Sequence, residues 1–369
     1  MRCNSASWDS SVDGYSKAIL LDELCQRYYR VLHKLIVLAC FWEDIMNFAK
    51  TLVAGIAAST MLIGGAALAD YPTKPIKIMV GFSAGGGTDT TARGFASYMH
   101  EAPSMNGMPA YIVNLPGASG QKAASAVLDE DRDGHTLYMI NIGTFIAGEL
   151  AKGDDRPYHI PDDFVNLGCA SQLVTSLQVH SSNPAQTMQE FIANAKASGE
   201  EITWGTSGAA TMHATIGHVF FDSNGIKHKK VPFKGGSKAR AALVSQSVDA
   251  VFGGVNTIPG FEADIRALAS AGAERDPMAP DLPTFVEQGA PGVEFTGLMC
   301  LFAANGVSDE VKADVGAAIE TIAGISGYQK YMGKNDLASF YTNAADAAAS
   351  QDVMYDVMGP VVAQIIANQ

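Results

Sequence analysis

Short apolar segments alternate with amphipathic helical segments through most of this chain, and this alternation constrains the fold more than any other feature. An apolar segment at 76–80 leads into a segment at 88–101 whose apolar residues recur at helical spacing. Apolar segments at 110–114 and 136–140 follow, with a helical segment at 121–128 between them. This order is typical of α/β proteins in which helices cover both faces of a parallel sheet. We therefore expect an α/β fold.

The alternation restarts at Leu173, which indicates a second lobe of the same kind. Segments at 201–205, 227–233 and 248–254 are expected to continue it as strands, and helical segments or small-residue loops separate them. Two lobes of this type usually bind a ligand in the cleft between them, at the carboxyl ends of their strands. We therefore expect the ligand site in that cleft.

The lobe boundaries follow from the length of the chain and from a late apolar segment. A chain of 369 residues is long for a single core. The segment GLMCLFA at 297–303 predicts a return of the chain to the first lobe. We therefore expect residues 70–172 with 298–369 to form lobe 1, and residues 173–297 to form lobe 2.

The N-terminal region has the pattern of a secretory signal. Lys50 precedes the uncharged run TLVAGIAASTMLIGGAALA, which ends in Ala67-Leu68-Ala69. A basic start, an apolar centre and an A-x-A end predict a signal peptide over 46–69 that is cleaved on export. A permanent membrane anchor is the alternative, since the run is about long enough to span a bilayer. We interpret residues 1–45 as an upstream extension of the reading frame.

Cysteine content and charge limit the classes of ligand. Cleavage after Ala69 leaves only Cys169 and Cys300, which form either one disulfide or two buried thiols and lie in no metal or redox pattern. No metal or cofactor is therefore expected. The net charge of −13 argues against nucleic acid as a partner. It does not exclude a small anion, because exposed charges beyond about 10 Å are largely screened at 0.1 M salt.

The segment VGFSAGGGTD at 80–89 allows three interpretations. Its G-x-S-x-G core matches the nucleophile elbow of serine hydrolases and would make Ser83 the nucleophile. Its glycines resemble a phosphate cradle, but neither G-x-G-x-x-G nor the P-loop pattern is present. Its end resembles a helix N-terminus that binds an anion, with Thr88 and Asp89 as capping residues. We favour the third interpretation, because no earlier strand of the mature chain is predicted that would supply a hydrolase oxyanion loop. A tight turn without a ligand remains the alternative.

A second segment repeats this pattern. Residues 204–211, WGTSGAAT, again pass from a strand through small residues to a helix. Two facing helix N-termini would hold one dicarboxylate from opposite sides, because each presents free backbone N–H groups and a positive dipole end. The recurrence therefore favours a carboxylate site over an isolated turn.

Several ordered motifs of the mature chain resemble one family. They are YPTKPIKIMVGFSAGGGTDTTAR, VNLPGASGQKAA, DGHTLYM, GTSGAATMHA, VPFKGGSKARAAL, SVDAVFGG and DLPTFVEQGAPGVEF. Together they resemble the periplasmic solute-binding receptors of tripartite tricarboxylate transporters, the Bug receptors. The resemblance implies a two-lobed, type II-like periplasmic binding protein fold with the ligand in the interdomain cleft. It also implies a periplasmic, monomeric receptor without catalytic activity, which passes a small organic carboxylate to membrane permease subunits.

The resemblance also implies which residues bind the ligand. They form a first loop over 82–89, a second over 206–211 and a third wall over 141–144. The implied ligand-binding residues are Phe82, Ser83, Ala84, Gly85, Gly86, Gly87, Thr88, Asp89, Asn141, Thr144, Thr206, Ser207, Gly208, Ala209, Ala210 and Thr211.

Four further residues have open roles. Lys234 either faces the ligand or lies on the surface, and His213 is interpreted as structural rather than as a ligand contact. Gly253-Gly254 replaces a segment in which the family often has a polar residue, and Asn256 could substitute for it. The competing functions are a secreted serine hydrolase that uses Ser83 and a receptor that serves a signalling partner.

Overall fold

The computed structural model of this chain describes residues 26–31, 71–290 and 295–367. The chain divides into two units, Met1–Leu68 and Ala69–Gln369. In the first unit, residues 26–31 form a short exposed helical segment. The predicted signal peptide and nearly all of the predicted extension lie outside the described residues and stay predictions. No helix within the described ranges is long and apolar enough to cross a membrane.

Three parallel strands open the second unit and confirm the first three apolar segments as strands. Strand β1 (Ile76–Val80) pairs with β2 (Ala110–Asn114) on one side and with β3 (Thr136–Asn141) on the other. Helix α2 (Gly87–Tyr98) connects β1 to β2, and α3 (Gln121–Leu128) connects β2 to β3. Each connection crosses from the end of one strand to the start of a parallel one, as βαβ units do.

A second parallel group has the same construction. Strand β5 (Ile202–Thr206) lies between β6 (His228–Pro232) and β7 (Ala250–Gly254). Helix α7 (Met212–Ser223) connects β5 to β6, and α8 (Gly236–Val244) connects β6 to β7. The second α/β group that the sequence predicts is therefore present.

Antiparallel strands join the two parallel groups, so the sheet as a whole is mixed. The long strand β4 (Phe164–His180) pairs antiparallel with β9 (Thr296–Ala304) up to Val174, and from Thr175 onward with β7. Strands β8 (Ile265–Ser270) and β10 (Ala338–Thr342) also pair antiparallel with β4. The sheet order is β2-β1-β3-β9-β4-β7-β5-β6, so β4 belongs to both halves.

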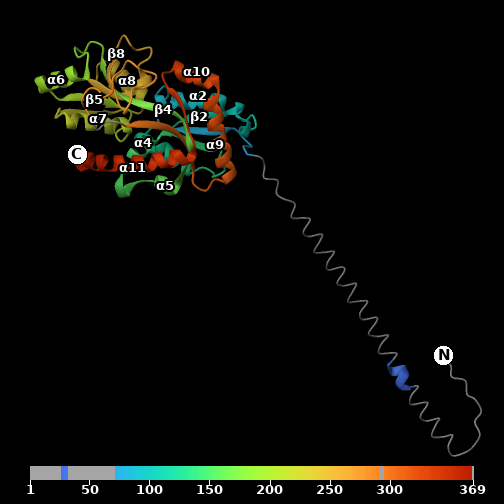
Figure 1. Ribbon diagram of the computed structural model, residues 1–369. Helices are drawn as coiled ribbons and strands as arrows, with labels where there is room; N and C mark the ends of the chain where they lie inside the picture. Colours follow the sequence, from blue (N-terminus) through green and yellow to red (C-terminus); the bar gives the residue numbers. More distant parts are fainter. Residues whose placement is uncertain (1–25, 32–70, 291–294, 368–369) are drawn as a thin grey trace, which may run out of the picture. The chain divides into compact units, whose positions relative to one another are not determined.

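The remaining helices pack around this sheet. Helix α4 (Ile142–Leu150) follows β3 directly. Helix α11 (Ala344–Ala367), red in Figure 1, contacts α4, β4 and α7. The other helices are α5 (Ile160–Asp163), α6 (Met188–Ser198), α9 (Asp309–Gly324) and α10 (Ser326–Lys334), and the short 3-10 helices are η1 (Met99–Glu101), η2 (Pro103–Met105), η3 (Ala118–Gly120), η4 (Gly153–Asp155) and η5 (Val255–Thr257).

Buried apolar side chains form two main cores. The first core takes its fully buried residues from 71–173 and 299–362, and the second takes them from 177–295. Cys169 and Cys300 face each other across β4 and β9 in the first core and form a disulfide, so the disulfide alternative holds.

Candidate functional site

A small cavity of about 30 Å³ lies where the parallel strands of both groups end. It is lined by Phe82, Gly86, Gly87, Thr88, Asn141, Thr144, Leu173, Ser207, His213, Gly236, Gly254, Asn256 and Thr257. Residues that follow β1, β3, β5, β6 and β7 thus meet at one place. This is the position at which α/β folds of this kind bind ligands.

The N-termini of four helices contribute to the cavity wall. The N-cap residues are Gly86 for α2, Asn141 for α4, Thr211 for α7 and Gly235 for α8. The first turn of each helix has backbone N–H groups without an intrahelical partner, and the helix dipole places a partial positive charge there. The wall therefore favours an anionic group.

Asn141 brings a further donor to the cavity. Its Oδ1 accepts a hydrogen bond from the Thr144 N–H at 3.0 Å, so the amide orientation is defined by the helix cap. Its Nδ2 is buried and has no hydrogen-bond partner. Gly297 makes room for this amide, because a Cβ at position 297 would lie 1.9 Å from Nδ2. Asn141 therefore presents an unpaired donor, which a carboxylate oxygen can satisfy.

Asp89 organises the first loop and is almost fully buried. Its carboxylate accepts hydrogen bonds from the Gly85 N–H at 2.9 Å, from Arg93 Nε at 2.9 Å and from Asn114 Nδ2 at 2.9 Å. Burial acts to raise the pKa of Asp89, but these hydrogen bonds outweigh it and hold the pKa below its usual range. The carboxylate thus fixes the loop that precedes α2. Asp89 thus acts as a capping residue from the first turn of α2, while the N-cap position itself is Gly86.

His213 lies at the cavity and is a neutral imidazole. Its Nδ1 is 2.6 Å from Thr175 Oγ1, and burial lowers its pKa to about 4. It therefore contributes no positive charge near neutral pH.

Ser83 lies in the first loop with its hydroxyl already engaged. Its Oγ donates to the backbone oxygen of Lys234 at 2.9 Å, and its N–H donates to the same oxygen. Among the described residues, no histidine is hydrogen-bonded to Ser83, as a serine hydrolase would require. The side chain of Lys234 is exposed, and its backbone rather than its ammonium meets the first loop.

The structure separates the predicted site residues into two sets. Seven of them line the small cavity, namely Phe82, Gly86, Gly87, Thr88, Asn141, Thr144 and Ser207. The others lie in the same loops without lining it: Ser83, Ala84, Gly85, Asp89, Thr206, Gly208, Ala209, Ala210 and Thr211. Whether either set binds a ligand stays a prediction.

Several cavity residues were outside the predicted set. Leu173, His213, Gly236, Gly254, Asn256 and Thr257 all line the cavity. Gly236 begins α8 just after β6, and Asn256 follows β7. The signal that finds these two is the rule that ligand residues follow each parallel strand at the sheet switch point.

One cluster elsewhere has the composition of a metal site. His218, Asp222 and His228 have ligand atoms within 4.8 Å of one another. However, the Trp204 indole N–H donates to His228 Nδ1 at 3.0 Å, and His228 Nε2 is 2.9 Å from Asp222 Oδ1. Since an indole only donates, His228 carries its proton on Nε2 and donates it to Asp222. A metal on Nε2 would leave both ring nitrogens without a proton, so this arrangement does not fit a metal ion.

Two α/β groups that share a strand, with a ligand cavity at their meeting strand ends, define the class of periplasmic solute-binding proteins. The family model of the tripartite tricarboxylate transporter family receptor matches residues 96–364, and the chain belongs to this family. Its fold is the two-lobed, type II-like periplasmic binding protein fold, as the sequence predicted.

Three similar proteins agree with this assignment. The UPF0065 protein from the gbd 5' region of Cupriavidus necator is 29% identical over 326 residues, which are 84% of this chain and 97% of the relative. The solved structure of a periplasmic transporter is 26% identical with a TM-score of 0.75, covering 79% of this chain and 97% of that one. MatC from Rhodopseudomonas palustris, solved with bound malate, is 25% identical with a TM-score of 0.72, covering 79% and 100%. The chain is thus a solute-binding receptor, and the hydrolase alternative is not supported.

Proposed function

We propose that this receptor binds a small dicarboxylate in the cavity where its strand ends meet. The observation that carries the proposal is the convergence of four helix N-termini on one cavity that Asn141, with its unpaired Nδ2, also lines. Such a wall offers many donors and a positive potential without a charged side chain. The malate bound to MatC supports a ligand of the hydroxy-dicarboxylate class.

Binding requires the two lobes to separate and close. A cavity of about 30 Å³ has room for about one water molecule, at the roughly 30 Å³ that a water occupies in the liquid, and is smaller than a dicarboxylate. We propose that the first core belongs to lobe 1, residues 70–172 with 298–369, and the second to lobe 2, residues 173–297. The ligand enters when the lobes part and is enclosed when they close.

The protein acts in the periplasm as a carrier and not as an enzyme. The receptor family supports this role. The loaded receptor, as a monomer, delivers its ligand to membrane permease subunits of a tripartite tricarboxylate transporter.

Export removes residues up to Ala69, because the run after Lys50 ends in an A-x-A site. N-terminal sequencing of the exported chain is expected to begin at Asp70. A mature chain that retains residues 46–69 would identify a membrane anchor instead.

Calorimetric titration with L-malate and with its diamide tests the ligand class. We expect saturable binding of malate and none of the diamide, because helix N-termini select the negative charge. Binding weakens only modestly between low and moderate salt, since an enclosed site is screened less than a surface one. Equal binding of acid and diamide would refute a carboxylate site, and absence of malate binding directs the search to other dicarboxylates.

Asn141→Asp tests the site itself. Aspartate keeps the oxygen that caps α4 but replaces the free donor with a negative charge that repels a carboxylate. We expect malate affinity to fall by about tenfold to a hundredfold, the loss of a hydrogen bond to a charged group. Asn224→Asp, at the end of α7 and outside the cavity, is the matched control and should bind as the wild type does. Equal affinities of both variants for malate would mean that malate does not bind in this cavity.

A further inference from the structure

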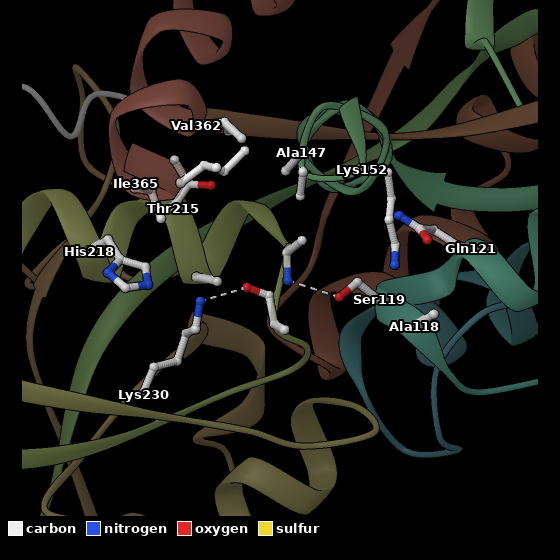
Figure 2. A pocket seen from close by; sticks show the side chains of 15 residues that line it. Ala118, Ser119, Gln121, Ala147, Lys152, Thr215, His218, Lys230, Val362 and Ile365 are labelled. Carbon is white, nitrogen blue, oxygen red and sulfur yellow. Dashed lines mark hydrogen bonds between the residues drawn. The ribbon is translucent and has the colours of Figure 1, made fainter. Parts of the chain in front are cut away.

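A second and much larger cavity, of about 270 Å³, lies beside the segment that follows β5 (Figure 2). Ala209 and Ala210 of that segment line it, together with residues of η3, α4, α7, β6 and α11. None of these residues except Ala209 and Ala210 belongs to the predicted dicarboxylate site. Its walls combine elements of both cores, since α4 and α11 belong to the first and α7 to the second.

Two lysines supply the charge of this cavity. Lys230 is half-buried, and its Nζ donates to the backbone oxygen of Ala209 at 2.9 Å. Lys152 follows the end of α4. In Figure 2 it and Lys230 lie on opposite sides of the hydrogen bond that the Ala210 N–H donates to Ser119 Oγ. Within the described ranges, neither lysine has a carboxylate within 4.0 Å.

His218 is the third basic side chain at this cavity, and it is uncharged near neutral pH. Burial lowers the pKa of His218 to about 4, so its imidazole is neutral. Its Nε2 is buried and has no hydrogen-bond partner. It is therefore a polar but uncharged part of the wall, and the positive charge comes from the lysines.

Apart from the uncharged polar residues Ser119, Gln121 and Thr215, the rest of the wall is aliphatic. Val362, Ile365 and Ile366 of α11 form one side, and Figure 2 shows Val362 and Ile365 across the cavity from Lys230. The remaining apolar lining residues are Ala118, Ala147, Ala151, Ala209, Ala210 and Ala214. Of the described residues that line the cavity, none is Phe, Tyr or Trp. A wall of this composition suits an alkyl chain rather than a flat aromatic ring.

We propose that this cavity is a second ligand site and that it takes a medium-chain aliphatic monocarboxylate. The carboxylate lies between Lys230, Lys152 and the Ser119 hydroxyl, and the alkyl chain lies against α11. The volume corresponds to about nine water molecules, which suits a chain of octanoate length. Since its walls come from both cores, a bound chain also holds them together.

Calorimetric titration with sodium octanoate tests the proposal. We expect saturable binding of octanoate, and none of octanamide or acetate, which lack the charge and the chain respectively. Lys230→Gln and Lys152→Gln should each weaken octanoate binding by about tenfold, as for loss of a charge-assisted hydrogen bond. Ala151→Leu fills the cavity without a change of charge and should abolish binding, with folding checked by circular dichroism.

The controls separate this site from the dicarboxylate site. Lys229→Gln alters the exposed neighbour of Lys230 on the same strand and should bind octanoate as the wild type does. Asn141→Asp should lose malate affinity and keep octanoate affinity within about twofold. The proposal is overturned if octanoate does not bind, if octanamide binds equally, or if Lys229→Gln weakens binding as much as Lys230→Gln. Loss of octanoate binding in Asn141→Asp would also overturn it, because the chain would then occupy the first cavity.

Discussion

Side chains at and beside the small cavity hold hydrogen bonds within the protein that set the geometry of the proposed dicarboxylate site. Asp89 holds the first loop through Gly85, Arg93 and Asn114. Asn141 caps α4 with its oxygen and keeps its nitrogen free. The donors are thus positioned before a ligand arrives, which reduces the ordering that binding requires.

His213 makes the stability of the fold depend on pH. Its pKa is about 4 in the folded chain and about 6.5 when exposed, so between these values the unfolded chain binds a proton that the folded chain does not. The free energy of unfolding therefore falls as the pH is lowered through this window, by about 2 kcal/mol at pH 5. We expect His213→Asn, which retains a polar group near Thr175, to lose this part of the dependence.

Urea unfolding at pH 7 and pH 5 measures the effect. The drop in unfolding free energy between the two pH values should be about 2 kcal/mol smaller in His213→Asn than in the wild type. His100→Asn, at an exposed position, is the control and should keep the wild-type drop. An identical drop in all three proteins would mean that His213 is not held neutral.

At the scale of elements, local sequence patterns predicted most strands, and the exceptions have steric reasons. Helix α4 is not evident from the sequence, because Gly143 lies in its first turn and glycine disfavours helix. In the structure Gly143 is a packing residue, since a Cβ there would lie 2.9 Å from Met212 Sδ of α7. The early part of β4 was missed because Gly168 interrupts its pattern. It lies at a shift in register with β9, where an extra residue is accommodated in a bulge.

The candidate site was predictable only in part, because some of its residues are brought together by contacts between distant segments. Loops with glycine before a helix are visible in one sequence, and they identified the residues from Phe82 to Thr88 that reach the cavity. Leu173 and Thr257 reach it through the pairing of β4 with β7, which depends on contacts between distant segments. No local pattern records such pairing.

The disulfide between β4 and β9 is the strongest single link between two elements. It closes a loop across a sequence separation of 131 between two fully buried cysteines. Loop-closure entropy alone predicts a contribution of about 5 kcal/mol to the free energy of unfolding, and measured values usually reach about 2 to 5 kcal/mol. We expect the double variant Cys169→Ala with Cys300→Ala to unfold at a clearly lower urea concentration.

The wild type unfolded in urea with a thiol reductant is the matched comparison. Once reduced, it should unfold near the midpoint of the double variant, while the oxidised wild type unfolds later. Coincident midpoints for the oxidised wild type and the variant would show that the two cysteines are unpaired in the native protein.

At the scale of the whole molecule, few direct hydrogen bonds join segments of the two cores around the cavities. The Ser83 N–H and hydroxyl donate to the Lys234 oxygen, and Ser237 Oγ donates to the Ala84 oxygen. The Met212 N–H donates to Thr144 Oγ1, and the Ala210 N–H donates to Ser119 Oγ. These contacts involve loops and helix ends, so they can break and re-form without loss of either core. A dicarboxylate between the same loops would add to them when the lobes close.

The sharing of β4 between both halves of the sheet determines how the lobes can move. Sliding one half past the other along the strand direction would break the hydrogen-bonded ladder that β4 forms with β9 on one half and with β7 on the other. Bending β4 out of the sheet plane near residues 174 and 175 leaves both ladders intact. The proposed closing motion is thus a hinge rotation about one axis, and a single angle describes it. A membrane partner that binds the outer surface of both lobes would then distinguish a loaded receptor from an empty one by that angle alone.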